Sequence, residues 1–275
     1  MSTSGRVRAR KSLGQHWLVD GGVLERIAGA ADFTEDDTVI EVGAGTGLLT
    51  DRLAQRASRL IAVEIDRALV ERLRERFAGR PSVCVVEADV LAVSAEELLA
   101  MGGGRLPYVV VGNLPFFIGT AIVRGFLTAA VRPRWLLVTL QAEVAQAMAA
   151  SPGRMSFLSV HTQLFAAARV LFRIPASAFK PAPKVDSAVL RLDVLDSPEV
   201  EVDSVEEFLA LVQAGFAAPR KRLRNSLAIG LRMSPPECQT ILSRAGLDPA
   251  QRPAELSLSD WRPLYLAYRA ETAGG

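Results

Sequence analysis

The sequence predicts an α/β fold, in which a mostly parallel sheet is flanked by helices and followed by a small all-helical C-terminal domain. Apolar runs rich in Val, Ile and Leu recur roughly 20 to 27 residues apart through the first two-thirds of the chain, a spacing typical of βαβ units. A glycine-rich turn follows the first run, and strand-like runs cease after Leu195. The five predicted strands are 38–42, 60–64, 83–87, 108–112 and 135–140.

Helical patterns separate several of these strands, and two further strands follow them. A helix that begins at Ala142 is expected to stop at Ser151-Pro152-Gly153, because proline and glycine interrupt helices. Two later apolar runs are joined by a proline-rich loop, and they are expected to form a hairpin that adds antiparallel strands at the sheet edge. The predicted helices are 47–56, 68–77 and 142–150, and the hairpin strands are 169–174 and 188–194.

The last third of the chain has a different character. Ser197-Pro198 is typical of a linker, and prolines separate the helical patterns beyond it. Ser259 followed by Asp260 is a typical helix start. We therefore predict two domains, residues 1–195 and residues 196–275. The predicted C-terminal helices are 205–217, 220–231, 236–245 and 259–270.

Composition excludes several classes of protein. With 275 residues, 49% hydrophobic and 23% charged, the chain is typical of a soluble globular protein. It has no apolar run long enough to span a membrane and no apolar segment after its basic N-terminus, so we expect a cytoplasmic protein. Two cysteines, Cys84 and Cys238, and two histidines, His16 and His161, are too few for a disulfide framework or a metal centre, so no metal is expected. Nothing in the sequence demands more than a monomer.

Positive charge is concentrated in two places although the net charge is only +2. Such local basic patches favour a polyanionic partner, whereas a frayed tail and a solvated helix face are the simpler interpretation. The two patches are Arg6, Arg8, Arg10 and Lys11 at the N-terminus and Arg220, Lys221, Arg222 and Arg224 in the C-terminal domain.

The ends of the first three predicted strands suggest a cofactor pocket. Gly43 and Gly45 permit a tight turn and a close approach of a ligand to the backbone. Glu64 ends the second strand, where an acid can accept both hydroxyls of a ribose, and Asp89 follows the third, where an acid can accept an adenine amino hydrogen. A dinucleotide needs a third glycine at position 48, which is Leu48, so S-adenosyl-L-methionine fits better than a nicotinamide cofactor.

Asn113-Leu114-Pro115-Phe116 follows the fourth predicted strand. In an open α/β sheet, ligands bind at the carboxyl ends of the strands. An amide and a carbonyl can accept hydrogen bonds from an exocyclic amine, while the aromatic ring covers the face of a flat base. The simpler alternative is an ordinary turn, because Asn and Pro are common turn residues.

Taken together, these motifs resemble the ribosomal RNA adenine N6-dimethyltransferases, and most of all the bacterial enzymes of that family that act on small-subunit rRNA. The resemblance covers nearly the whole chain and begins with KSLGQHWL at 11–18, similar to the K-x-x-G-Q-N-F-L of the family. It includes the loop at 178–187, similar to F-x-P-x-P-K-V-x-S. It implies a Rossmann-like class I methyltransferase domain with a mostly parallel seven-stranded sheet, and a helical domain that binds RNA or the ribosome.

The resemblance also implies roles for individual residues. The contacts expected for S-adenosyl-L-methionine are His16, Leu18, Gly43, Gly45, Glu64, Asp89 and Asn113. The catalytic residues expected are Asn113, Leu114, Pro115 and Phe116. The residues expected to contact RNA are Phe116, Phe179, Lys180, Lys184, Arg220, Lys221, Arg222 and Arg224.

Three positions depart from the family pattern. His16 stands where the family usually has Asn, Trp17 where it has Phe, and Phe116 where the small-subunit enzymes usually have Tyr. Phenylalanine at the last position is more typical of the branch that methylates large-subunit rRNA and confers macrolide resistance. That activity is therefore the alternative function, together with a ribosome-assembly factor whose catalysis is secondary.

Overall fold

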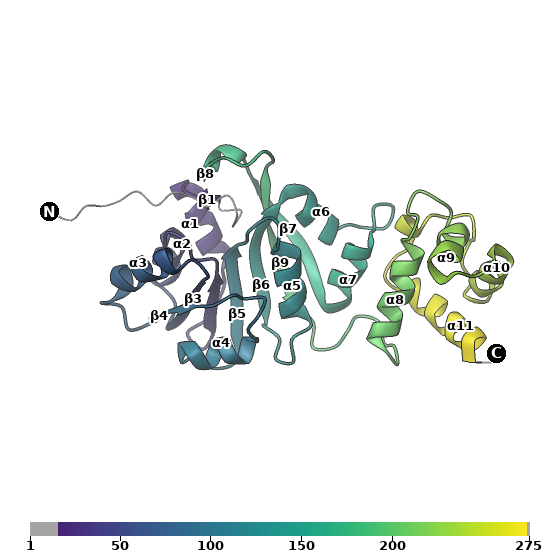
Figure 1. The fold of residues 1–275 in the computed structure, drawn as a ribbon, viewed down its shortest axis with the longest axis horizontal. Helices are drawn as coiled ribbons and strands as arrows, with labels where there is room; N and C mark the ends of the chain where they lie inside the picture. The colour runs from purple at the N-terminus through teal and green to yellow at the C-terminus, as the bar shows by residue number, and fades with distance from the viewer. Residues whose placement is uncertain (1–15, 274–275) are drawn as a thin grey trace. The chain divides into compact units, whose positions relative to one another are not determined.

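The computed structural model describes residues 16–273, in two compact units. The first unit contains the described residues up to Ala145 together with Arg169–Val194, and the second contains Gln146–Ala168 together with the described residues from Leu195 on. Figure 1 shows a sheet flanked by helices in the first unit and helices in the second. The basic N-terminal arm, residues 6–11, lies outside the described residues.

The first unit is built on a seven-stranded sheet with the order β4-β3-β2-β5-β6-β9-β7. Strands β2 to β6 pair in parallel, and β9 pairs antiparallel with β6. This confirms the predicted parallel sheet and the strands that the hairpin adds at its edge. The strands are β2 (Thr38–Val42), β3 (Arg59–Glu64), β4 (Val83–Glu87), β5 (Tyr108–Asn113), β6 (Trp135–Gln141), β7 (Ala166–Ile174) and β9 (Ser187–Val194).

Strand order reverses at β2, which pairs with β3 on one side and with β5 on the other. Val42, the last residue of β2, is in register with Val63 of β3 and with Gly112 of β5. The carboxyl ends of these three strands therefore lie at one edge of the sheet. Such a reversal of strand order is where ligands bind in open α/β sheets.

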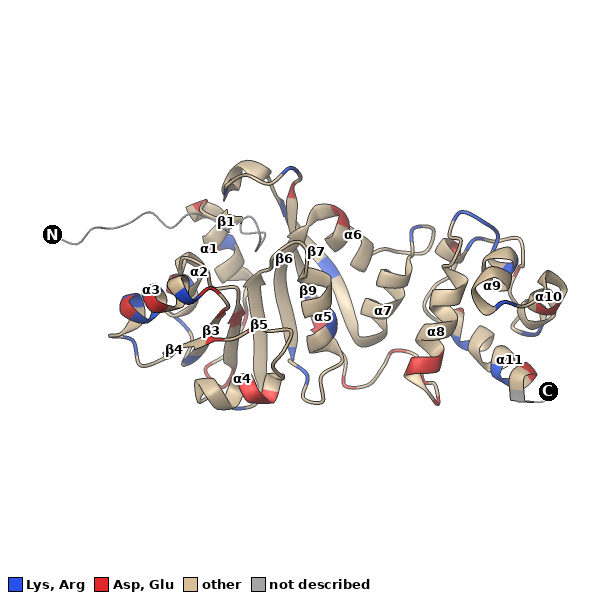
Figure 2. Cartoon of the chain, viewed as in Figure 1, with Lys and Arg blue, Asp and Glu red and all other residues tan. Residues whose placement is uncertain are grey.

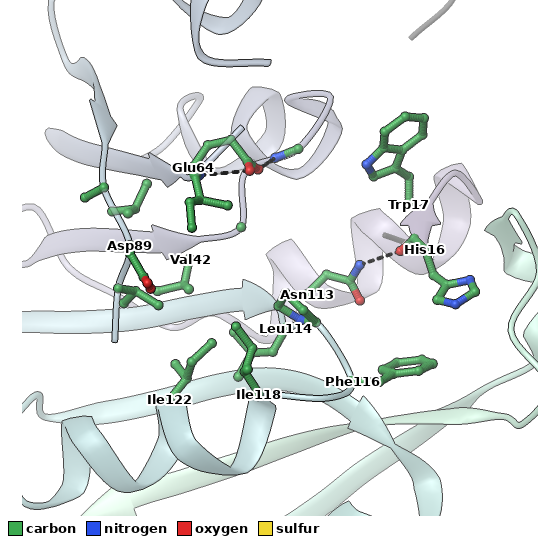
Figure 3. Close-up of a pocket in the computed structure, with 17 residues that line it drawn as sticks. His16, Trp17, Val42, Glu64, Asp89, Asn113, Leu114, Phe116, Ile118 and Ile122 are labelled. Atoms are coloured by element: carbon green, nitrogen blue, oxygen red, sulfur yellow. Dashed lines mark hydrogen bonds between the residues drawn. The ribbon is translucent and has the colours of Figure 1, made fainter. Parts of the chain in front are cut away.

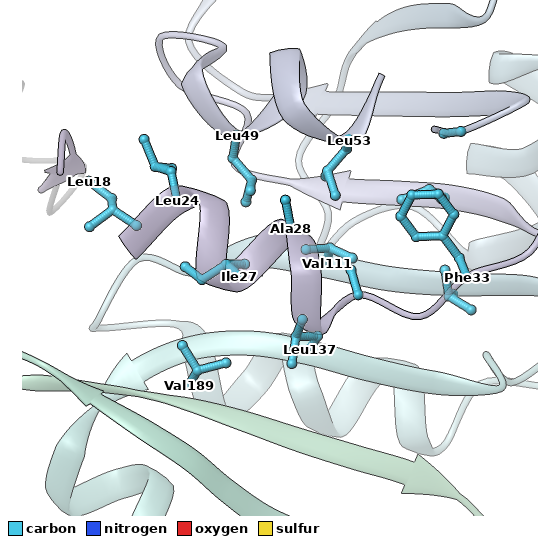
Figure 4. Close-up of a cluster of buried hydrophobic side chains, with 14 of the residues drawn as sticks. Leu18, Leu24, Ile27, Ala28, Phe33, Leu49, Leu53, Val111, Leu137 and Val189 are labelled. Atoms are coloured by element: carbon cyan, nitrogen blue, oxygen red, sulfur yellow. The ribbon is translucent and has the colours of Figure 1, made fainter. Parts of the chain in front are cut away.

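Helices cover both faces of the sheet, as parallel sheets require. On one face, Leu24 and Ile27 of α1 (Gly21–Ala30) and Leu53 of α2 (Leu48–Leu53) pack with the side chains that β2, β5 and β6 direct to that face (Figure 4). Helix α3 (Arg67–Phe77) lies on the same face, because it packs with Ala62 of β3, which points to the same side as Leu60 of that core cluster. The opposite face carries α4 (Ala95–Gly102), where Gly102 lies against Ile61, and α5 (Gly119–Leu127), where Gly119 lies against Leu140.

A short second sheet ties the start of the described chain to the proline-rich loop. Strand β1 (Trp17–Leu18) pairs antiparallel with β8 (Phe179–Lys180), in the register Trp17↔Lys180 and Leu18↔Phe179. The Val19 N–H donates to the Ala178 carbonyl at 2.9 Å. Segments about 160 residues apart in sequence are thus fixed side by side, a pairing that local sequence patterns do not predict.

The second unit is a small helical core. Phe208, Trp261 and Tyr265 are fully buried in it. Helix α7 contacts α8, and the Leu195 N–H donates to the Phe165 carbonyl at 2.9 Å, which places residues 146–168 in this unit. Its helices are α7 (Phe157–Phe165), α8 (Val205–Gly215), α9 (Leu223–Leu231), α10 (Pro235–Arg244) and α11 (Trp261–Ala273). The division into domains at residue 195 stays a prediction. The compact units differ from it in one respect, because residues 146–168 belong to the second unit and not to the first.

The predicted helix 220–231 begins later than expected. Helix α9 starts at Leu223, whose N–H donates to the Gln251 carbonyl at 2.7 Å. The Lys221 N–H donates to Ala218, so the residues before the helix form a turn. The basic residues of this region therefore lie on a loop and the first turn of a helix.

Gly230→Ala is expected to destabilise the second unit by about 1–3 kcal/mol, a typical cost of overpacking. A Cβ at Gly230 would lie 2.4 Å from the backbone of Ala214, where α9 crosses α8. Gly125→Ala in α5 is the matched control, because a Cβ there meets nothing within 4 Å and alanine favours a helix. Urea denaturation of both variants checks the prediction, and equal stabilities would contradict it.

Candidate active site

A cavity opens where the ends of β2, β3 and β5 meet. It has an empty volume of about 740 Å³, part of it open to solvent, and all of its lining residues belong to the first unit. Most of the residues that the sequence predicted for the cofactor and the amine line this one cavity (Figure 3). They are His16, Gly43, Gly45, Glu64, Asp89, Asn113, Leu114, Pro115 and Phe116.

The glycine turn after β2 has the conformation that its sequence requires. Gly43, Gly45 and Gly47 have φ angles of 72°, 56° and 80°, which other residues adopt only with strain. A side chain at position 45 would also be crowded, because a Cβ at Gly45 would lie 3.3 Å from the indole of Trp17. The turn therefore brings the backbone itself to the cavity wall.

Glu64 joins the glycine turn to the end of β3. Its Oε2 accepts from the Gly45 N–H at 2.9 Å, and its Oε1 accepts from the N–H groups of Ile65 at 2.9 Å and Asp66 at 3.0 Å. A carboxylate offers about four acceptor positions, so at least one remains for a ligand. The side chain is 6% exposed and borders the cavity.

Asp89, on the loop after β4, lines the same cavity as Glu64 (Figure 3). Its Oδ1 accepts from the Leu91 N–H at 2.9 Å, which fixes the side chain against its own loop. The residue is exposed. Its other oxygen can therefore accept a hydrogen bond from a ligand at little cost in desolvation.

Asn113 holds an acceptor ready at the end of β5. Its Nδ2 donates to the His16 carbonyl at 3.0 Å, which fixes the orientation of the amide. Its Oδ1 is buried and has no hydrogen-bond partner among the described residues. A buried polar atom without a partner is costly, so its presence indicates that something else completes the site.

Two aromatic rings lie next to this amide. The imidazole of His16 stacks on the ring of Phe116, with ring centroids 5.4 Å apart and planes inclined by 21°. Between His16 Nδ1 and the Pro181 carbonyl the distance is 2.7 Å, and since a carbonyl only accepts, Nδ1 carries the proton. The chain turns directly after Phe116, where the Ile118 N–H donates to the Pro115 carbonyl at 3.2 Å.

Glu41 is a buried acid that sequence reasoning did not assign to the site. It is 1% exposed, its Oε2 lacks a hydrogen-bond partner, and it lines a smaller cavity beside the glycine turn. Burial raises its pKa to about 8, and Glu64 and Asp51 add to the rise. Thr50 lies close enough to lower the pKa in part, but its hydroxyl does not reach full hydrogen-bond geometry. The sequence does carry a signal for Glu41, since an acid within an apolar strand, two residues before the glycine turn, is unusual.

The remaining predicted residues lie elsewhere. Leu18 and Phe179 are buried in the core cluster of the first unit and do not line the main cavity, although Leu18 borders the smaller one. Lys180 and Lys184 are exposed on the proline-rich loop. The basic residues between α8 and α9 form the blue loop of the second unit in Figure 2; Arg220, Lys221 and Arg222 are exposed and Arg224 is half-buried.

Sequence reasoning also missed the apolar lining of the cavity. Ile65 and Val90 border it next to the two acids, Trp17 borders it against the glycine turn, and Ile118 and Ile122 close it at the start of α5. Their signal was weak, because single apolar residues after strands are common. Within residues 16–273, no cluster of three or more His, Cys, Asp or Glu side chains could hold a metal ion. Among the described helices, none is both long enough and apolar enough to cross a membrane.

This fold and site define a Rossmann-like methyltransferase. The sheet order, the glycine turn after β2, the acids after β3 and β4 and the Asn-Leu-Pro-Phe turn after β5 occur together at one edge of the sheet. The chain belongs to the ribosomal RNA adenine dimethylase family, whose profile matches residues 6–265.

Two curated relatives share one name, and each matches nearly the whole of this chain. The chain is 42% identical to the ribosomal RNA small subunit methyltransferase A of Geobacter metallireducens, over 96% of this chain and 97% of that protein. It is 41% identical to the enzyme of the same name from Dehalococcoides mccartyi, over 95% and 89% of the two chains. Among solved structures, the 23S rRNA methyltransferase ErmE is 31% identical, with a TM-score of 0.72 over 91% of this chain and 98% of its own. A dimethyladenosine transferase from Plasmodium falciparum shares the fold, with a TM-score of 0.79 at 22% identity.

Proposed function

We propose that this protein transfers methyl groups from S-adenosyl-L-methionine to N6 of two adjacent adenines in the 3′-terminal hairpin of 16S rRNA in the small ribosomal subunit. One observation carries the proposal: the buried Oδ1 of Asn113 has no partner, yet its amide is fixed by the His16 carbonyl. An exocyclic amine supplies the missing donor. Methylation of this rRNA is a step in ribosome biogenesis, and the proposal includes a cytoplasmic location for the enzyme.

The residues at the strand ends fit S-adenosyl-L-methionine. Glu64 retains an acceptor for the ribose, and Asp89 has an exposed oxygen for the adenine amino group. Gly43 and Gly45 present backbone to the methionine end, beside the unpartnered Oε2 of Glu41. The cofactor supplies an electrophilic methyl group on a sulfonium, so the target nitrogen needs positioning more than it needs a strong base.

The Asn-Leu-Pro-Phe turn positions the amine. The lone pair of an adenine amino group is delocalised into the ring, which makes it a poor nucleophile. Asn113 Oδ1 and the Leu114 carbonyl accept its two hydrogens, draw the nitrogen towards tetrahedral geometry and direct its lone pair at the methyl group. Pro115 stiffens the turn, and Phe116 stacks on the base.

The same arrangement accounts for two methylations and no more. Each transfer breaks the S–CH3 bond of the donor, leaves a neutral thioether and forms an N–CH3 bond, and the nitrogen then releases one proton to solvent. After the first methylation the nitrogen therefore keeps one N–H, and a single acceptor suffices to hold it. After the second no donor remains, so the product no longer satisfies Asn113. A paired adenine hides its amino group, so the base must leave its stack before it reaches the clamp.

Exposed lysine and arginine side chains in both units support RNA as a partner. Lys180 and Lys184 lie on the loop that is paired with the start of the described chain, and the basic loop before α9 belongs to the second unit. Contacts of this kind hold phosphates and position the RNA without selecting its sequence. The prediction that the protein acts as a monomer remains part of the proposal.

The relatives support the small subunit over the large one. The two relatives named small subunit methyltransferase A are 41% and 42% identical over nearly the whole chain, whereas the 23S enzyme is 31% identical. Phe116 is thus compatible with a small-subunit substrate, because stacking needs the ring and not the phenol hydroxyl.

The function is tested by incubating the protein with radiolabelled S-adenosyl-L-methionine and small subunits that lack these methyl groups. Nuclease digestion and chromatography should then yield N6,N6-dimethyladenosine. Only monomethylated adenosine, or none, would contradict the proposal. Calorimetry with NADH should show no tight binding, which separates this activity from that of a nicotinamide oxidoreductase.

Phe116→Ala is expected to lower kcat/KM for the small subunit by about 5- to 140-fold, the usual worth of one base–aromatic stack. Phe116→Tyr should retain activity because it keeps the ring. Phe117→Ala is the matched control, since Phe117 is 61% exposed and does not line the cavity. Steady-state kinetics of the three variants check this, and a tyrosine variant as poor as the alanine variant would contradict stacking.

A further inference from the structure

We propose that the imidazole of His16 is the second aromatic wall of the slot that holds the target adenine, opposite Phe116. This inference rests on the proposed function and adds a positioning residue on the substrate side. The resemblance to known enzymes placed His16 among the cofactor contacts instead. The geometry of its ring points to the substrate base.

The ring is held from outside the cofactor pocket. Its Nδ1–H donates to the Pro181 carbonyl at 2.7 Å, and that proline directly follows strand β8. The backbone next to it is fixed by the pairing of Trp17 with Lys180. The loop that carries Lys180 and Lys184 thus sets the position of the imidazole.

The ring faces the amine clamp. It stacks on Phe116 with centroids 5.4 Å apart, and the carbonyl of the same residue accepts from Nδ2 of Asn113. In Figure 3 the His16 ring, the Phe116 ring and the Asn113 amide lie around one part of the cavity. A base whose amine reaches the Asn113 Oδ1 therefore meets both rings.

Other aromatic residues are less suited to this position. Phe179, predicted to cover the second face of the base, is 2% exposed and packs in the core with Leu18. The indole of Trp17 lies against the glycine turn, 3.3 Å from where a Cβ of Gly45 would be. Among the described residues that line the cavity, His16 is the aromatic side chain that stacks on Phe116.

A base enters the slot only if the two rings separate. The two rings stack directly on each other, with centroids 5.4 Å apart, which leaves no room for a base between them. They must therefore move apart by about the thickness of one aromatic ring to admit the base. In the free protein the rings of His16 and Phe116 cover each other. A bound base would replace that contact by stacking on His16 with one face and on Phe116 with the other.

Three variants separate the ring of His16 from its N–H group. His16→Ala removes both, His16→Asn keeps an N–H donor without a ring, and His16→Phe keeps a ring without the donor. All three keep the backbone carbonyl that holds Asn113. Each is assayed for KM and kcat with small subunits and for the Kd of S-adenosyl-L-methionine by calorimetry, with circular dichroism to confirm folding.

The alanine and asparagine variants should raise KM for the subunit by about tenfold, in line with the loss of one stack, while the Kd for the cofactor changes less than about twofold. The phenylalanine variant should stay near wild type. A cofactor Kd that rises by as much as the subunit KM would overturn the assignment and make His16 a cofactor ligand. An alanine variant as active as wild type, or more active, would also overturn it. An inactive wild type would contradict the proposed function instead.

Discussion

Replacing Asn113 with alanine is expected to reduce methyl transfer at least about 100-fold, the loss typical when one preorganised hydrogen-bond partner of a reacting group is removed. The buried Oδ1 has no partner in the described structure, so its role is to accept from the incoming amine. Binding of the small subunit should change little, because the phosphate contacts lie elsewhere. Single-turnover methylation and a filter-binding assay measure the two effects separately.

A matched variant tests the orientation of this amide. Asn113→Asp keeps an oxygen at the acceptor position but replaces the Nδ2–H donor with a second oxygen, which the His16 carbonyl repels. We expect activity between those of wild type and the alanine variant. Near-full turnover of Asn113→Ala would refute the proposed clamp. An inactive variant that still binds immature subunits would support an additional assembly role.

The second large effect concerns stability and pH. In the unfolded chain Glu41 titrates near 4.5, whereas burial raises its folded pKa to about 8. Between these values the folded state binds more protons than the unfolded state, so stability falls as pH rises. The contribution of Glu41 protonation to the free energy of unfolding is complete below about pH 4.5 and is lost by about pH 8. At 1.36 kcal/mol per pKa unit, the loss amounts to about 4 to 5 kcal/mol.

Glu41→Gln should therefore flatten the pH dependence of the unfolding free energy. A neutral amide does not titrate, so the stability of the variant relative to wild type should increase as pH rises from 5.5 to about 8.5. Urea denaturation without cofactor at several pH values measures this. Glu75→Gln, on an exposed turn of α3, serves as the matched control. Parallel profiles for wild type and Glu41→Gln would show that Glu41 is already ionised in the folded protein.

Local sequence patterns predicted the sheet well, because its central strands β2, β3, β5 and β6 are apolar runs buried on both faces. They did not predict α5, which contains Gly119 and Gly125 and several β-branched residues with low helix propensity. Its stability comes from burial of Ile122 and Phe126, which only the tertiary structure provides. Helix α4 is also absent from the predicted helices, although its sequence carries a readable signal, the capping box of Ser94 and Glu97.

The site residues that lie at the ends of strands could be predicted from the sequence. Glu64, Asp89 and Asn113 each end or follow a predicted strand, and parallel strands end at a common edge. Contacts that depend on distant segments were not predictable. The pairing of β1 with β8 buries Phe179 and brings His16 to Phe116, and nothing near either residue in the sequence encodes that contact.

The most direct test of the central claim is to map the methylated positions. Separated small and large subunits that lack the modification are incubated with the protein and S-adenosyl-L-methionine, and reverse transcription then detects dimethylated adenines as stops. We predict stops at two adjacent adenines near the 3′ end of the small-subunit rRNA and none on the large subunit. Stops on the large-subunit rRNA, or on neither, would contradict the account.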